Sequence, residues 1–84
     1  MTEKNITVNG VMMVPVVSVM RNHSLPQKEV RRLLRDNNIP YRTKEMYGFG
    51  GMQRLFYVPS KLCSVARKML KASVYWANAV EYLE

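Results

Sequence analysis

The pattern of hydrophobic and polar positions begins with short β-prone runs near the start of the chain. Ile6–Val8 and Val11–Val14 are two β-prone runs on either side of Asn9 and Gly10. Asn-Gly favours a type I′ turn, because both central residues of that turn need a positive φ. The sequence therefore predicts a small N-terminal β-hairpin.

The segment from Pro15 to Asn22 fits two kinds of secondary structure. Its β-branched valines favour a strand. A proline at a first helical position and the spacing of Val16, Val19 and Met20 favour a short helix. We expect the helix, because a tight turn and a second helix follow and would complete a helix-turn-helix. The alternative is a strand, which gives the core a β-α-β-β-α order.

A helix is expected from about Leu25 to Asn37-Asn38. Ser24 at the N-cap and Gln27 three residues later form a capping box. The two asparagines tolerate the left-handed conformation that often ends a helix. Pro40 prevents the helix from continuing.

The two sides of this helix differ in character. At 100° per residue, Val30, Leu33 and Leu34 form one apolar stripe that would pack on a core. The opposite side carries four cations: Lys28, Arg31, Arg32 and Arg35. A helix docked through aliphatic side chains with a row of cations facing solvent suits a DNA groove.

Two further β-prone runs, Tyr41–Met46 and Gln53–Val58, are expected to form an antiparallel pair. The intervening stretch, Tyr47–Met52, contains three glycines, which supply the backbone angles of a loop tip. The loop lacks the lysine and the helix start of a phosphate-binding loop.

The C-terminal part is expected to be one long helix. Ser60 is a candidate N-cap, and neither glycine nor proline occurs from Lys61 onward. A heptad-like seam has alternating spacings of four and three, and its side chains are apolar except for Ser73: Leu62, Ala66, Met69, Ser73, Trp76, Val80 and Leu83. We expect Met69, Trp76, Val80 and Leu83 to form an interface with a second copy or a partner. Packing of this helix on its own domain is the alternative.

Length and charge narrow the function. The 84 residues suffice for a single domain, and a hydrophobic fraction of 48% is that of a globular protein. The formal net charge of +7 favours a polyanionic partner. Cations cluster within positions 28–44: Lys28, Arg31, Arg32, Arg35, Arg42 and Lys44.

The residue types argue for a binding protein rather than an enzyme. One cysteine and one histidine cannot form a conventional zinc site, so we expect no metal and no cofactor. We interpret Cys63 as a small buried hydrophobe and His23 as a turn residue. The longest apolar run, Val11–Val17, is too short to span a bilayer and contains Pro15. We therefore expect no membrane partner, and because a single cysteine allows no intrachain disulfide, we expect a protein of the reducing cytoplasm.

Three stretches carry a resemblance to a known class of proteins. They are ITVNGVMMVP at Ile6–Pro15, LPQKEVRRLLRDNNIPY at Leu25–Tyr41 and RLFYVPSK at Arg54–Lys61. In this order they resemble the winged helix-turn-helix domains of phage excisionases and of mercury-resistance-type (MerR) transcription regulators. The resemblance covers about positions 6–62.

The resemblance implies an α+β fold, a small winged helix-turn-helix. Its elements would be an N-terminal β-hairpin, two short helices, a two-stranded wing and a long C-terminal helix. Residues 1–84 would form a single domain, with the winged core at 6–59. The helix at 60–84 would serve packing or self-association.

By the same resemblance, the recognition helix would enter the major groove and the wing would lie along the adjacent minor groove or backbone. The implied helix contacts are Gln27, Lys28, Arg31, Arg32 and Arg35. The implied wing contacts are Arg42, Lys44 and Arg54.

The leading hypothesis is a sequence-specific DNA-binding protein. It would be a recombination directionality factor or a transcription regulator that acts by site occupancy and DNA bending, with itself or a recombinase as a further partner. A second hypothesis is an inhibitor or adaptor that docks on a host enzyme through aromatic anchors. Those anchors are Tyr47, Phe49, Trp76 and Tyr82. A third is RNA binding, with wing aromatics stacking on bases.

Overall fold

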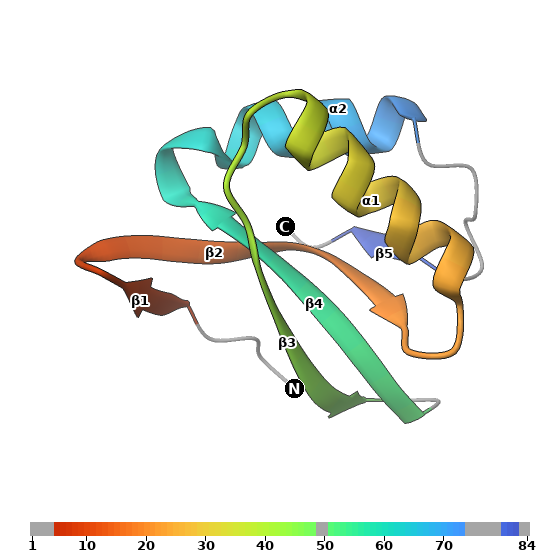
Figure 1. The fold of residues 1–84 in the computed structure, drawn as a ribbon. Helices are drawn as coiled ribbons and strands as arrows, with labels where there is room; N and C mark the ends of the chain where they lie inside the picture. The colour runs from red at the N-terminus through yellow and green to blue at the C-terminus, as the bar shows by residue number, and fades with distance from the viewer. Residues whose placement is uncertain (1–4, 49–50, 74–79, 83–84) are drawn as a thin grey trace.

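A computed structural model of the chain describes residues 5–48, 51–73 and 80–82 (Figure 1). These residues form an antiparallel sheet with two α-helices on one of its faces. In chain order the elements are β1 (Ile6–Val8), β2 (Val11–Met20), α1 (Ser24–Asp36), β3 (Arg42–Gly48), β4 (Gly51–Pro59), the 3₁₀ turn η1 (Ser60–Leu62), α2 (Cys63–Ser73) and β5 (Val80–Tyr82). The fold is α+β.

The central strand is β2, which pairs along both of its edges. One edge pairs with β4 over most of its length. The other edge pairs with β1 near the start of β2 and with β5 near its end. β3 lies outside β4, so the described sheet has the order β1-β2-β4-β3 with β5 beside β2. The register with β4 shifts between Pro15 and Val17, and such a bulge bends a strand.

The N-terminal hairpin is confirmed, with Asn9 at φ 51° and Gly10 at φ 80°. The helix expected at 15–22 is wrong, because the strand that leaves the hairpin continues to Met20. Val16, Val17 and Val19 are fully buried beneath the helices. β-branched side chains suit such a position, and the alternative β-α-β-β-α order is found from β2 to α2, with β1 before it and β5 after it.

The long C-terminal helix is also wrong. α2 ends at Ser73, and Val80–Tyr82 is a strand that pairs with β2. Val80 belongs to the core between sheet and helices, and Tyr82 packs against that core. Val80 is therefore not on a helical seam with Met69, and Trp76 and Leu83 lie outside the described residues.

These two differences overturn the winged helix-turn-helix. The first of its two short helices is a sheet strand, and the hairpin expected as a wing, β3–β4, is part of the main sheet. The hairpin itself is confirmed, with Gly48 paired to Gly51.

The helix α1 is confirmed at nearly the expected bounds. Val30, Leu33 and Leu34 are buried in the main core. At the C-terminal end Asn38 has φ 57°, and the Ile39 amide donates to the Leu34 carbonyl at 2.9 Å. This is the left-handed ending that the sequence predicts.

The capping box at the start of α1 is wrong. The residue at the N-cap is His23, and no side chain caps the helix there. Gln27 is buried instead, and its amide bonds elsewhere.

The sheet has apolar side chains on both faces. The face under the helices holds the main core, which includes Phe56 and Val58. The opposite face holds a smaller cluster of Met13, Leu55 and Tyr57. Because side chains alternate along a strand, these two clusters fix the face on which each β3 residue lies.

Candidate nucleic-acid interface

Three of the four expected cations on α1 form a line on its surface. Lys28 and Arg35 are exposed, and Arg31 between them is half-buried. The three span about 10 Å along the axis at 1.5 Å per residue. We call Lys28, Arg31 and Arg35 the α1 cation row.

Arg31 lies at the junction of α1 with the sheet. Its guanidinium carbon is 5.5 Å from the centroid of the Phe56 ring, and this ring in turn packs against Tyr41 with centroids 6.0 Å apart. A cation above an aromatic face is attracted by the ring's quadrupole. Arg31 is thus partly oriented within the protein while its charge stays without a carboxylate contact among the described residues.

Arg32 differs from its neighbours because two carboxylates hold it. Its Nη2 is 2.7 Å from an oxygen of Glu29, and its Nη1 is 3.2 Å from an oxygen of Asp36. The hydrogen bond from Arg32 holds the pKa of Glu29 below its usual value, and the same bond raises the pKa of Arg32. We leave Arg32 out of the candidate interface, since its charge is already balanced.

Gln27 occupies an interior position rather than a surface one. Gln27 is only 4% exposed to solvent. The amide nitrogen donates to the carbonyls of Met20 at 3.0 Å and Arg21 at 2.8 Å, and the amide oxygen accepts from Arg54 at 3.0 Å. This side chain joins α1 to the end of β2 and to β4, so we also leave it out of the base-reading set.

Arg54 lies on the helix side of the sheet and is paired there. Its Nη2 donates to the Glu45 carboxylate, which also lies 3.6 Å from Nε of Arg21. Arg54 is therefore not a free wing cation in this structure. Arg54 instead joins β4 to β3 through Glu45 and to α1 through Gln27.

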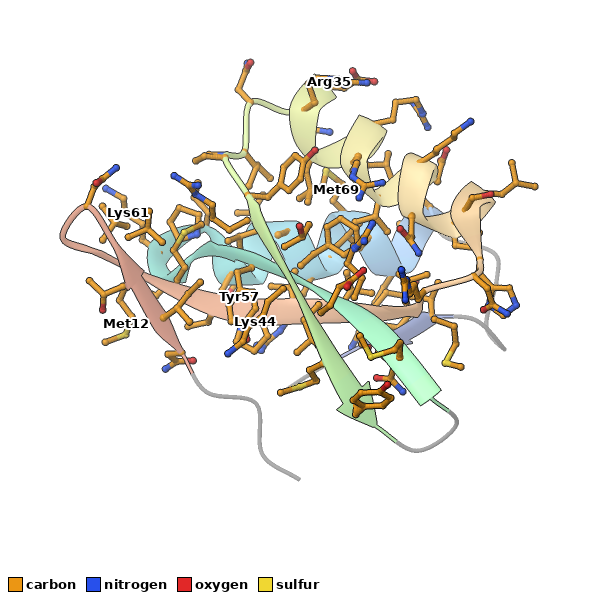
Figure 2. All side chains as sticks on the ribbon, turned by 60° about the horizontal axis from the view of Figure 1, so that its bottom comes forward. Met12, Arg35, Lys44, Tyr57, Lys61 and Met69 are labelled. Carbon is orange, nitrogen blue, oxygen red and sulfur yellow. The ribbon has the colours of Figure 1, made fainter. Side chains whose placement is uncertain are left out.

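The other two expected wing cations lie on the opposite face of the sheet. Arg42 pairs with Tyr57 and Lys44 pairs with Leu55, and both partners belong to the smaller cluster. Figure 2 shows Arg35 on the helix layer and Lys44 close to Tyr57, across the sheet. One flat partner surface cannot contact the α1 cation row and Lys44 together.

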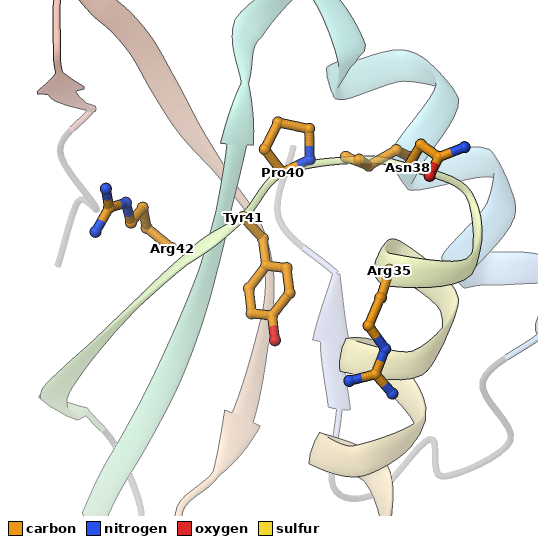
Figure 3. Close-up of a pocket in the computed structure, with 6 residues that line it drawn as sticks. Arg35, Asn38, Pro40, Tyr41 and Arg42 are labelled. Carbon is orange, nitrogen blue, oxygen red and sulfur yellow. The ribbon is translucent and has the colours of Figure 1, made fainter.

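A shallow open depression adjoins the C-terminal end of the α1 cation row (Figure 3). It is lined by Arg35, Asn38, Ile39, Pro40, Tyr41 and Arg42. The Arg35 and Tyr41 side chains lie along its two sides, whereas Arg42 points away from them. The depression offers an arginine and a tyrosine hydroxyl to a polar group placed between α1 and β3.

Within residues 5–48, 51–73 and 80–82, no three His, Cys, Asp or Glu side chains are grouped as metal ligands. Cys63 is half-buried against the main core, as a small hydrophobe would be, and His23 is exposed in the turn before α1. None of the described helices has both the length and the apolar character needed to cross a membrane.

The sequence reasoning missed the roles of Arg21, Tyr41 and Glu45. A period-two pattern in the strand would have placed Tyr41, Thr43 and Glu45 on one face and Arg42 and Lys44 on the other. The pairing of β3 with β4 then decides which of these faces lies beneath α1.

Comparison with known proteins finds no matching family model, no matching curated protein and no matching solved structure.

Proposed function

We propose that the protein binds double-stranded DNA through the α1 cation row. The observation that carries this proposal is the distribution of charge on the helix side. Each carboxylate whose side chain is described, on Glu29, Asp36 or Glu45, pairs with Arg21, Arg32 or Arg54. The α1 cation row has no such partner within the described part of the chain and so presents uncompensated positive charge.

A duplex fits this surface better than a single strand does. The row lies along one side of a helix, and a major groove about 12 Å wide admits an α-helix. Proteins that bind single strands stack bases on exposed aromatic side chains. Tyr47 is the strongly exposed aromatic residue among those described, and it lies at the far end of β3, away from Arg35.

The proposed mechanism is occupancy of DNA, without chemistry on it. Lys28 and Arg35 would contact phosphates, which supply most of the affinity and little sequence information. A guanidinium of the row that reaches a base edge can contact guanine bidentately. Such occupancy could serve site-specific recombination or transcription control, which are the two roles expected from the sequence.

An NMR titration of the ¹⁵N-labelled protein with a short random duplex tests the proposal. We expect the largest shifts at the backbone amides of α1 from Lys28 to Arg35, with little change on the β3 face that carries Lys44. The shifts should vanish at high salt, because counterion release drives phosphate binding. A polyglutamate peptide of equal charge serves as the control for a generic polyanion.

Three results would contradict the proposal. The protein could leave duplex DNA unbound at low salt. It could bind single-stranded RNA more tightly than the duplex, which supports the RNA hypothesis. The shifts could also centre on the face that carries Lys44, which would exclude the α1 cation row as the contact surface.

A further inference from the structure

Two arginines converge on one oxygen of Glu45, at the N-terminal end of α1. Arg54 donates through Nη2 to Oε2, and Nε of Arg21 lies 3.6 Å from the same atom. Both arginines and Glu45 belong to different segments of the chain: the β2–α1 turn, β4 and β3. The sheet register places Glu45 directly opposite Arg54.

We propose that Arg21 and Arg54 form a phosphate site, that Glu45 fills it in the free protein, and that a DNA backbone phosphate displaces the carboxylate. This inference rests on the proposed DNA binding and adds a specific subsite to it. Guanidinium groups bind carboxylate and phosphate oxygens through the same forked hydrogen bonds. Glu45 therefore occupies the position that the phosphate would take.

The buried amide of Gln27 makes this a prepared site rather than a chance surface pair. Gln27 is 4% exposed and is fixed by two backbone carbonyls. Its Oε1 accepts from Nη1 of Arg54 at 3.0 Å, which orients the guanidinium so that Nη2 faces outward to Glu45. A donor held by a buried partner loses little freedom when it binds a ligand.

The Glu45 carboxylate is exposed enough to be displaced from the two arginines. The side chain of Glu45 is 35% exposed and that of Arg21 is 62% exposed, so solvent reaches the site. Ion pairs at such exposure contribute little to stability, and displacing one costs little. The site also adjoins the α1 cation row, because Gln27 and Arg31 are four residues apart on α1 and so are neighbours on the same side of the helix.

The test compares Glu45→Gln with a matched control, Asp36→Asn. Each change removes one negative charge from a carboxylate that pairs with arginine, but Asp36 pairs with Arg32, outside the proposed interface. Affinity for a random duplex is measured over a range of salt concentrations, with a thermal melt of each variant to verify folding. We expect E45Q to bind several-fold more tightly, because no carboxylate has to be displaced, and D36N to stay within twofold of wild type.

A double variant tests whether the tighter binding of E45Q depends on Arg21. In E45Q/R21Q the second cation is removed at an exposed position, and we expect affinity to return to near that of wild type. Equal binding by E45Q and wild type, an equal gain in D36N, or a gain that survives in E45Q/R21Q would each overturn the phosphate site. Failure of the DNA-binding proposal looks different, because wild type would then not bind the duplex at all.

Discussion

At the scale of single residues, Gln27 joins three parts of the fold through one side chain. Its amide bonds two carbonyls at the end of β2 and one guanidinium on β4, while its backbone belongs to α1. The spacing from Ser24 predicts that Gln27 caps the helix, and the resemblance to winged helix-turn-helix proteins implies that it contacts DNA. Local spacing cannot show that the end of β2 passes close enough to accept its hydrogen bonds.

Replacing Gln27 with alanine should lower the free energy of unfolding by about 1–3 kcal/mol. The change removes the hydrogen bonds of Gln27 to the carbonyls of Met20 and Arg21 and to the guanidinium of Arg54, and each hydrogen bond of this kind contributes about 0.5–1.5 kcal/mol. Urea denaturation measures the change. Lys28→Ala, at the exposed next position, is the control and should stay within about 0.5 kcal/mol of wild type. Equal midpoints for the two variants would show that the Gln27 hydrogen bonds contribute nothing measurable.

At the scale of elements, β5 shows where local pattern stops being informative. The apolar spacing of α2 continues beyond its end, so the sequence favours more helix. Val80–Tyr82 instead completes the second edge of β2 at Val17–Val19, about sixty residues earlier in the chain. A three-residue strand carries no local signal, and its pairing depends on where β2 has been placed. The same holds for 15–22, where the bulge near Pro15 interrupts the alternation of a regular strand.

The Tyr82 hydroxyl connects β5 to α2 by a hydrogen bond, from which we expect stability to depend on pH. It donates to the Leu70 carbonyl at 3.1 Å, and burial raises the pKa of Tyr82 above its usual value. Tyr82→Phe should lower the free energy of unfolding by about 1 kcal/mol at neutral pH.

The sign of the pH effect follows from the raised pKa. The folded state holds the Tyr82 proton more tightly, so its contribution is full below the unfolded pKa of about 10 and declines as pH rises through the folded value. The gap in urea midpoint between wild type and Y82F should therefore narrow between pH 8 and pH 11. Tyr47→Phe, at a largely exposed tyrosine, should show no gap at either pH. A gap that widens with pH would contradict the assignment.

At the scale of the whole molecule, the sheet topology places cations that are close together in the sequence on two different faces. The sequence shows that cations are concentrated within positions 28–44. It also predicts the helix α1 and the β3–β4 hairpin, and the structure confirms both. The sequence cannot show that the sheet divides those cations between two faces, because this depends on β3 pairing with β4 in one register. Lys28, Arg31 and Arg35 therefore remain the candidate contacts on the helix side, while Arg42 and Lys44 face the other way.

The central claim is that the α1 cation row is the DNA-binding surface, and the salt dependence of duplex binding tests it most directly. Two double variants, K28A/R35A and R42A/K44A, each remove two positive charges and so have the same net charge. The account predicts that K28A/R35A weakens binding at least tenfold and reduces the salt slope by about two, while R42A/K44A changes neither appreciably. Equal losses in both variants, or a larger loss in R42A/K44A, would contradict it.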